Sequence, residues 1–283
     1  MKLASFIDGS RASYGLVKGD QILDLGRALG DRYPTLRDLI ARADFRELVA
    51  NAAGSAGSLD IASVQFAPVI PNPDKIVCVG MNYRDHVAEI GRTVTERPAL
   101  FARFSDSQVG HLQPIIRPKV SEKYDYEGEL AVIIGKTGRH VLEHDALSYV
   151  AGYACYNEGS VRDWQRHTGQ FLSGKSFSKS GSFGPWMVTA DELAEPGKLT
   201  LQTRLNGQIV QQTSTANLIT SVPALIAYCS TIFNLLPGDV IVTGTPGGVG
   251  FKRSPPLFMK PGDTVEVEIS GVGTLRNGVA AEA

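Results

Sequence analysis

Apolar and polar positions alternate in short runs at the start of the chain. The pattern predicts strands over residues 3–7, 13–17 and 21–25, with a turn signal at residues 18–20. Apolar residues then recur at helical spacing, which predicts one amphipathic helix over residues 35–50, with Leu36, Leu39, Ile40 and Leu48 on its apolar face. Small residues at 54–58 and prolines at 68, 71 and 73 follow. We interpret this stretch as the end of a small N-terminal α+β domain, residues 1–70.

Strand-like runs dominate the remainder of the chain. They cover residues 75–79, 114–116, 130–134, 239–242 and 264–269, and Gly or Pro-Gly turns bound most of them. Helical patterns are fewer, and the best of them covers residues 217–234. Residues 71–283 are therefore expected to form a second domain of mixed α/β class, rich in β-structure. A large mixed sheet, rolled or closed, fits this order better than alternating strand and helix units.

Composition and charge narrow the classes of function. The chain has 283 residues, 43% of them apolar, and 28 basic against 29 acidic side chains. This composition is typical of a globular protein, and with no basic block we expect no nucleic-acid partner. No apolar run approaches the roughly 18 residues of a membrane span, and residues 1–9 form no signal peptide, so we expect no membrane partner and a cytoplasmic location.

The three cysteines do not form a metal-binding motif. Cys78, Cys155 and Cys229 are scattered through apolar stretches, without a Cys-x-x-Cys spacing or paired histidines nearby. We expect buried, reduced thiols. A metal ion in this protein would therefore bind to oxygen ligands.

Two glycine-containing segments resemble binding loops. Residues 169–176 match the eight-position phosphate-loop pattern, but no strand precedes them and no helix can follow, so we reject nucleotide binding. Lys175 within this segment is still a candidate functional cation, with a solvated lysine as the alternative. The glycine-rich stretch 243–250 follows a strand, and a binding loop and a structural turn fit it equally well.

Three carboxylates gather at the ends of two apolar strands. Glu127 and Glu129 flank Gly128 where the most apolar strand begins, and alternation places both on one face. Glu158 follows the apolar strand 150–156. If the face is buried, the carboxylates need a cation or protons between them, whereas a solvent-facing edge is the alternative. Oxygen ligands without sulfur or paired imidazoles favour Mg²⁺ or Mn²⁺.

A possible general base lies soon after the strand at residues 75–79. If residues 82–89 are helical, His86 and Glu89 share one face at i, i+3. A carboxylate that orients an imidazole suits proton abstraction. A surface pair is the alternative, because a single His with a Glu one turn away is common.

Read together, these features resemble the fumarylacetoacetate hydrolase superfamily. The resemblance covers about residues 75–280 and rests on segments 78–83, 126–130, 174–177, 184–186, 206–207, 237–241 and 243–246, together with His86 and Glu89. It implies a catalytic domain built as a mixed β-sheet roll, commonly paired into a homodimer.

The resemblance also implies roles for individual residues. Mg²⁺ or Mn²⁺ would bind to Glu127, Glu129 and Glu158, the last being an Asp in many members. His86, Glu89 and Lys175 would be catalytic. Gln165 and Thr245 would bind substrate, as would Arg103, which takes the place of a lysine found in many relatives.

The implied activity is metal-dependent hydrolysis of a carbon–carbon bond in an acylpyruvate or a related 2,4-diketo acid. His86 and Glu89 would activate the attacking water, and Lys175 and the cation would stabilise the enolate that leaves. The alternative is isomerisation or decarboxylation of 2-hydroxyhepta-2,4-diene-1,7-dioate, or decarboxylation of oxaloacetate. A non-catalytic, metal-stabilised binding protein is a third hypothesis. A sequence without His86 and Glu89 would favour it, and both residues are present.

Overall fold

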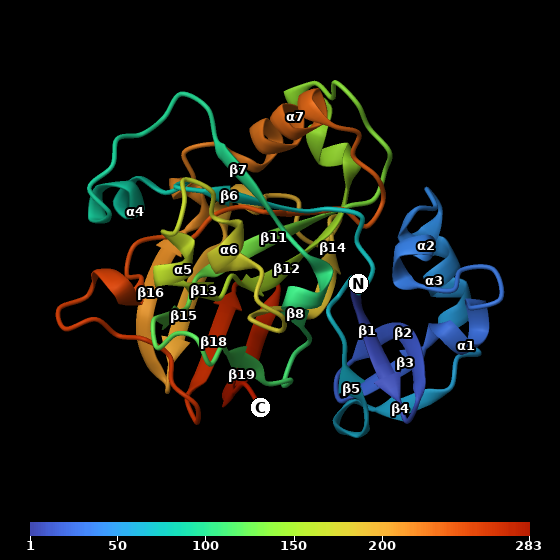
Figure 1. Cartoon of the computed structure of the whole chain (residues 1–283). Coiled ribbons are helices and arrows are strands. Elements are labelled where there is room, and N and C mark those ends of the chain that lie inside the picture. The colour runs from blue at the N-terminus through green and yellow to red at the C-terminus, as the bar shows by residue number, and fades with distance from the viewer.

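A computed structural model describes all 283 residues. The N-terminal part forms five strands and three short helices (Figure 1), in the order β1 (Lys2–Asp8), β2 (Arg11–Lys18), β3 (Gln21–Asp24), α1 (Leu25–Leu29), α2 (Leu36–Ile40), α3 (Phe45–Ala53), β4 (Ser58–Asp60) and β5 (Gln65–Phe66). The three predicted N-terminal strands are confirmed. The single helix predicted over 35–50 is wrong, because the five-residue step from Ile40 to Phe45 breaks the helical spacing and separates α2 from α3.

The rest of the chain is richer in strands. Its elements are β6 (Ile76–Gly80), α4 (Arg84–Glu89), β7 (Ala99–Arg103), β8 (Gln108–Val109), β9 (Ile115–Arg117), β10 (Tyr124–Asp125), β11 (Gly128–Ile134), β12 (Val150–Asn157), β13 (Ser160–Val161), α5 (Arg162–Gln165), α6 (Leu172–Lys175), β14 (Gly181–Thr189), β15 (Thr200–Leu205), β16 (Gln208–Ser214), α7 (Val222–Ile232), β17 (Val240–Val242), β18 (Thr264–Ile269) and β19 (Gly273–Ala281). Short 3₁₀ helices connect them: η1 (Ile61–Ser63), η2 (Ser105–Ser107), η3 (Glu143–Tyr149), η4 (Pro196–Lys198), η5 (Thr215–Asn217) and η6 (Gly250–Lys252).

The five strands predicted after residue 70 are present as β6, β9, β11, β17 and β18. The helix predicted over 217–234 begins later than expected, at Val222. Ser221 caps α7 by accepting a hydrogen bond from the Ala224 N–H, and Pro223 fits the first turn because N–H groups there need no partner within the helix.

One twelve-stranded mixed sheet connects the two parts of the chain. Its main path runs β4-β3-β2-β1-β14-β12-β11-β17-β6-β7, with β5 and β8 pairing off this path. β1 pairs with β14 antiparallel, and β17 pairs with β6 parallel. A second, five-stranded sheet has the order β16-β15-β18-β19-β9. This mixed α/β, strand-rich architecture confirms the predicted fold class.

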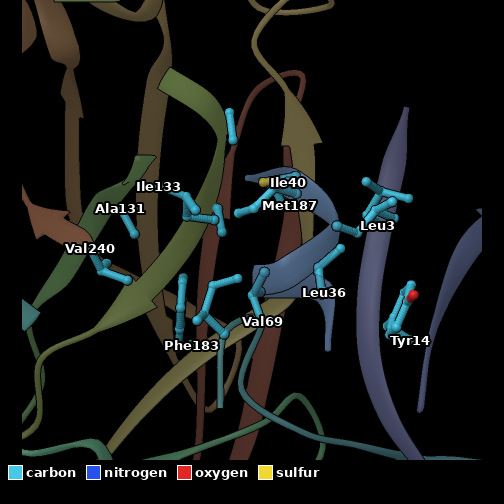
Figure 2. Packing of buried hydrophobic residues seen from close by; sticks show 14 of the residues in the cluster. Leu3, Tyr14, Leu36, Ile40, Val69, Ala131, Ile133, Phe183, Met187 and Val240 are labelled. Carbon is cyan, nitrogen blue, oxygen red and sulfur yellow. The ribbon is translucent and has the colours of Figure 1, made fainter. Parts of the chain in front are cut away.

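Hydrophobic packing also joins the two parts. Leu3 and Leu36 from the N-terminal part belong to the same buried cluster as Ile133 from β11 and Met187 from β14 (Figure 2). The division into domains 1–70 and 71–283 stays a prediction, since the sheet and this cluster cross the boundary.

Two further observations concern sequence predictions. Cys78, Cys155 and Cys229 are buried and form no disulfide, as expected. No helix has the length and apolar character required to cross a lipid bilayer.

Candidate active site

A cavity of about 270 Å³ lies among α4, β11, α5 and α6. Its lining includes His86, Glu127, Glu129, Glu158 and Lys175. Predicted site residues that lie more than 80 positions apart in the sequence, such as His86 and Lys175, thus line one cavity.

Strand pairing places the three glutamates together. β11 and β12 are antiparallel with Gly128 opposite Asn157, so Glu127 and Glu158 leave the sheet side by side, and the Glu158 N–H donates to the Glu127 carbonyl at 2.8 Å. All three carboxylates are buried, and each offers an oxygen within 4.8 Å of the other two. The predicted common face of Glu127 and Glu129 is therefore buried rather than solvent-facing.

Gly128 allows this arrangement to pack against the second sheet. A Cβ on Gly128 would lie 2.0 Å from the Thr203 side-chain oxygen of β15, far inside van der Waals contact. The Gly128 N–H donates to the Gln211 side chain at 2.9 Å. A larger residue here would push β11 away from β15 and would displace both neighbouring glutamates.

Two buried cations contact the carboxylates. Lys175 Nζ donates to Glu158 Oε2 at 2.7 Å and also to Glu127 Oε2. Arg162 lies 2.6 Å from Glu127 Oε1 and 2.8 Å from Asp125 Oδ2. Three buried carboxylates, those of Asp125, Glu127 and Glu158, are thus contacted by two cations, and no cation contacts Glu129.

The carboxylates differ in their preference for a proton. Burial acts against the charge of Glu127, but Arg162 and Lys175 outweigh it and hold the pKa of Glu127 well below its usual range. Burial and the charges of Glu158 and Glu127 raise the pKa of Glu129 well above its usual range. Burial likewise raises the pKa of Glu158, although Lys175 opposes the shift.

The residues fit a divalent cation. Glu158 Oε1 is buried without a hydrogen-bond partner, and unpaired buried carboxylate oxygens are costly. Negative charge exceeds positive charge among the groups in contact, and every candidate ligand atom is a carboxylate oxygen. Hard cations such as Mg²⁺ and Mn²⁺ prefer this donor set.

His86 and Glu89 lie on α4, which confirms the helical spacing on which their pairing depended. His86 is buried, and its Nδ1 lies 3.4 Å from Glu89 Oε2. Glu89 Oε1 also accepts a hydrogen bond from the Gly248 N–H at 3.0 Å. Burial raises the pKa of Glu89, but the bonds from His86 and Gly248 outweigh it, so the pKa of Glu89 is lowered. A charged Glu89 holds the imidazole with Nε2 left available to the cavity.

The glycine-rich stretch 243–250 holds the site together as a structural loop. The Gly244 N–H donates to Glu129 Oε2, and the Gly247 N–H donates to Asp85 of α4 at 3.2 Å. Thr245 lines the cavity and donates to the Gly128 carbonyl at 3.1 Å. This loop therefore contacts both the carboxylates and the helix that carries His86.

The other predicted substrate-binding residues differ in position. Gln165 lines the cavity and accepts a hydrogen bond from Arg162 at 3.0 Å. Arg103 does not line it: the buried guanidinium donates to the Gly159 carbonyl and the Ser180 hydroxyl, each at 2.9 Å. The structure thus places Arg103 behind the site, where it braces the backbone next to Glu158.

Sequence reasoning did not assign roles to several cavity residues. Arg162 forms buried ion pairs with both Asp125 and Glu127. Arg92 and Arg166 also line the cavity, as does Phe251. Nothing in their spacing distinguished these arginines from ordinary surface residues.

Comparison with known proteins identifies the family. The profile described as "Fumarylacetoacetate (FAA) hydrolase C-terminal" matches residues 75–280. The chain belongs to the fumarylacetoacetate hydrolase family. These relationships identify it as an enzyme of this superfamily, and they favour an enzyme over the hypothesis of a non-catalytic binding protein.

Two similar relatives within the family are named oxaloacetate tautomerases. The oxaloacetate tautomerase Fahd2a of Rattus norvegicus is 43% identical over 77% of this chain and 70% of its own length, and the human FAHD2A protein is equally similar. These two relatives are mitochondrial by name, so a cytoplasmic location for this chain stays a prediction.

Solved structures agree with the fold over the whole chain. A structure described as a putative HpcE protein from Mycobacterium smegmatis has 35% identity and a TM-score of 0.88, with full coverage of both chains. A maleylpyruvate hydrolase from Sphingobium sp. SYK-6, solved with manganese(II) and pyruvate, has 30% identity and a TM-score of 0.83, also with full coverage of both chains. Tautomerases and hydrolases both occur among the relatives, so family membership alone does not select the reaction.

Proposed function

We propose that this protein catalyses keto–enol tautomerisation of a 2-oxo dicarboxylic acid, with oxaloacetate as the first candidate. The observation that carries the proposal is a buried imidazole, held by a charged carboxylate, in one cavity with three glutamates and Lys175. The similarity to oxaloacetate tautomerases supports the choice of reaction. It supports the isomerase alternative better than the hydrolysis that the sequence first suggested.

We propose that Glu127, Glu129 and Glu158 hold one Mg²⁺ or Mn²⁺ ion. When bound, the ion would supply Lewis-acid stabilisation of negative charge on the oxygen atoms of the 2-oxo acid. Support comes from the oxygen-only ligand set and the unpartnered oxygen of Glu158.

The side chains of the chain then account for the proton transfers. In the direction from keto to enol, His86 Nε2 removes a proton from C3 of the substrate, and the electrons of that C–H bond form the C2–C3 double bond. Glu89 keeps the imidazole in position through Nδ1 and stabilises its charge after proton uptake. The C2 oxygen takes up one proton from solvent and the imidazolium of His86 releases one to solvent, so the product has the composition of the substrate and the base is regenerated.

Lys175 is suited to assist at the C2 oxygen. An ammonium group has three N–H donors, and two of these are directed to Glu127 and Glu158. The third is available to a negatively charged oxygen in the cavity. Because Lys175 is buried, this hydrogen bond would be stronger than one in water.

The test follows the loss of the oxaloacetate enol by ultraviolet absorbance, with purified Mg²⁺-loaded protein. We expect faster ketonisation than in buffer, and faster deuterium incorporation at C3 in D₂O. His86→Gln should lose most of this acceleration, whereas His144→Gln, which changes an exposed histidine on η3, should keep it. An enol that decays at the buffer rate with the loaded protein would refute the proposal.

Hydrolysis of an acylpyruvate is the second candidate. The pairing of His86 with Glu89 also suits activation of a water molecule, and the maleylpyruvate hydrolase neighbour supports this alternative. Incubation with acylpyruvates in H₂¹⁸O distinguishes the reactions, since hydrolysis releases an acid that carries solvent oxygen in its carboxylate. Tautomerisation releases no fragment.

We also propose that the protein is a homodimer, as the sequence resemblance implies. Light scattering coupled to size-exclusion chromatography measures this directly. A mass of about 30.4 kDa, that of one chain, at micromolar concentration would contradict it.

A further inference from the structure

Two arginines without ionic partners stand at the rim of the cavity. Arg92 follows α4, and Arg166 follows α5; both are exposed and both line the cavity. Figure 1 shows α4 and α5 on the same side of the molecule. Neither guanidinium lies within 4.0 Å of an acidic side chain, although the cavity contains three glutamates.

The glutamates line the buried part of the cavity and are already engaged. They are buried and contact Arg162, Lys175 or the backbone of the glycine-rich loop. The cavity thus has an acidic, buried end that suits a cation and a basic, exposed end that suits an anion. A small molecule that spans it would carry its oxo-acid group at the buried end and a second negative charge at the rim.

Phe251 gives the rim a fixed geometry. The guanidinium of Arg166 lies over its ring at 4.9 Å, and that of Arg162 lies over it at 4.3 Å. Phe251 itself is fixed because its N–H donates to Asp125 at 3.0 Å. Stacking on an aromatic ring reduces the freedom of a guanidinium while leaving its in-plane N–H donors open to a ligand.

We infer that Arg166 and Arg92 bind the distal carboxylate of the substrate and so determine specificity for dicarboxylic over monocarboxylic 2-oxo acids. This inference rests on the proposed function, since it assumes that the 2-oxo acid group occupies the buried end. A guanidinium recognises a carboxylate with two parallel N–H donors, and Arg166 is placed to present them. The sequence had assigned a substrate cation to Arg103, which instead lies behind the site.

The experiment compares two ligands that differ only at the distal end, 2-oxoglutarate and 2-oxopentanoate. Calorimetric titration of the Mg²⁺-loaded wild-type protein should show tighter binding of 2-oxoglutarate by roughly tenfold or more, because charge-assisted hydrogen bonds contribute at this scale. In Arg166→Gln the preference should fall toward parity through weaker 2-oxoglutarate binding, with 2-oxopentanoate affinity unchanged. Arg92→Gln should reduce it in the same direction.

Controls separate this effect from general changes of charge or fold. Arg84→Gln removes an exposed arginine of α4 that does not line the cavity, and it should keep the full preference. Arg166→Lys should retain part of the preference, since it keeps the charge but loses the paired donors. Unchanged thermal unfolding and Mg²⁺ affinity in each variant show that the fold and the buried end are intact.

The outcomes distinguish this inference from the proposed reaction. A wild-type protein that binds both ligands equally, or binds neither, would overturn the inference, as would a full preference in both glutamine variants. A protein that prefers 2-oxoglutarate through Arg166 but leaves enol-oxaloacetate unchanged would retain the inference and refute the tautomerase.

Discussion

Lys175→Met removes the cation that joins two buried carboxylates, and we expect it to destabilise the metal-free protein strongly. Lys175 and both of its partners are at most 5% exposed. In the variant Glu127 keeps Arg162, but Glu158 loses the one side-chain cation within 4.0 Å of it. Breaking a buried pair by removing one partner costs about 3–5 kcal/mol. For a chain of this size that cost corresponds to a fall in Tm of roughly 5–8 °C.

The loss of stability in Lys175→Met should depend on pH and on the presence of Mg²⁺. The lowered pKa of Glu127 contributes stability above its ordinary range near pH 4.5, and this contribution is lost as the pH falls through that range and below it. Glu158, with its raised pKa, can take up a proton instead. The difference between wild type and variant should therefore be largest near neutral pH and shrink toward pH 4. Added Mg²⁺ should also narrow it by compensating the freed carboxylates.

Thermal unfolding by circular dichroism, with and without a chelator, measures these effects. The matched control is Lys198→Met, which breaks an ion pair with Glu195 whose partners are 72% and 65% exposed. Surface pairs of this kind contribute about 0–1 kcal/mol, so its Tm should hardly change. If Lys175→Met unfolds at the temperature of Lys198→Met in chelator, the ionic role assigned to Lys175 is refuted.

Three further predictions concern the proposed base, the proposed metal ligands and a histidine outside the cavity. His86→Ala and Glu89→Ala should each lower turnover by about 10²–10⁴-fold while leaving Mg²⁺ affinity nearly intact, and full activity in either variant would contradict the pairing. Glu127→Ala or Glu129→Ala should weaken Mg²⁺ binding in a calorimetric titration after chelation, and an unchanged affinity would remove that residue from the metal site. Burial lowers the pKa of His111 from 6.5 to about 4. The neutral imidazole therefore contributes to the free energy of unfolding above pH 6.5, and this contribution is lost as the pH falls from 6.5 to 4. Urea unfolding at several pH values should show a smaller loss in His111→Gln, and equal losses would exclude His111 as a cause.

Much of the site could be predicted because its carboxylates lie at the ends of strands that the sequence pattern reveals. Glu127 and Glu129 share a face by strand alternation, which needs no tertiary information. Glu158 joins them only through the register of β11 and β12, and no spacing in the sequence encodes that register. The helix predicted over residues 35–50 failed for a local reason, since the prediction did not take account of the five-residue step from Ile40 to Phe45 that interrupts the helical spacing.

The roles of charged residues on loops and short helices could not be predicted from strand alternation. Arg103 and Arg166 are both isolated arginines in the sequence, yet the first is buried against Ser180 and the second is exposed at the cavity rim. Their roles depend on which segments fold over the sheet, and those contacts are long-range. Resemblance to a family indicated residues that meet at the buried end of the cavity, whereas Arg103, its candidate substrate cation, does not line the cavity.

The pairing of β1 with β14 has a practical consequence for anyone who shortens this protein. A chain cut to the family-matched segment would leave the β14 backbone unpaired next to Val188, along an edge that β1 now covers. It would also expose Met187 and Ile133, which pack in the cluster that includes Leu3. Open sheet edges beside apolar surface promote aggregation. The first strand thus acts as a built-in edge protector, and a fragment without it is expected to fail in expression before its catalysis can be assayed.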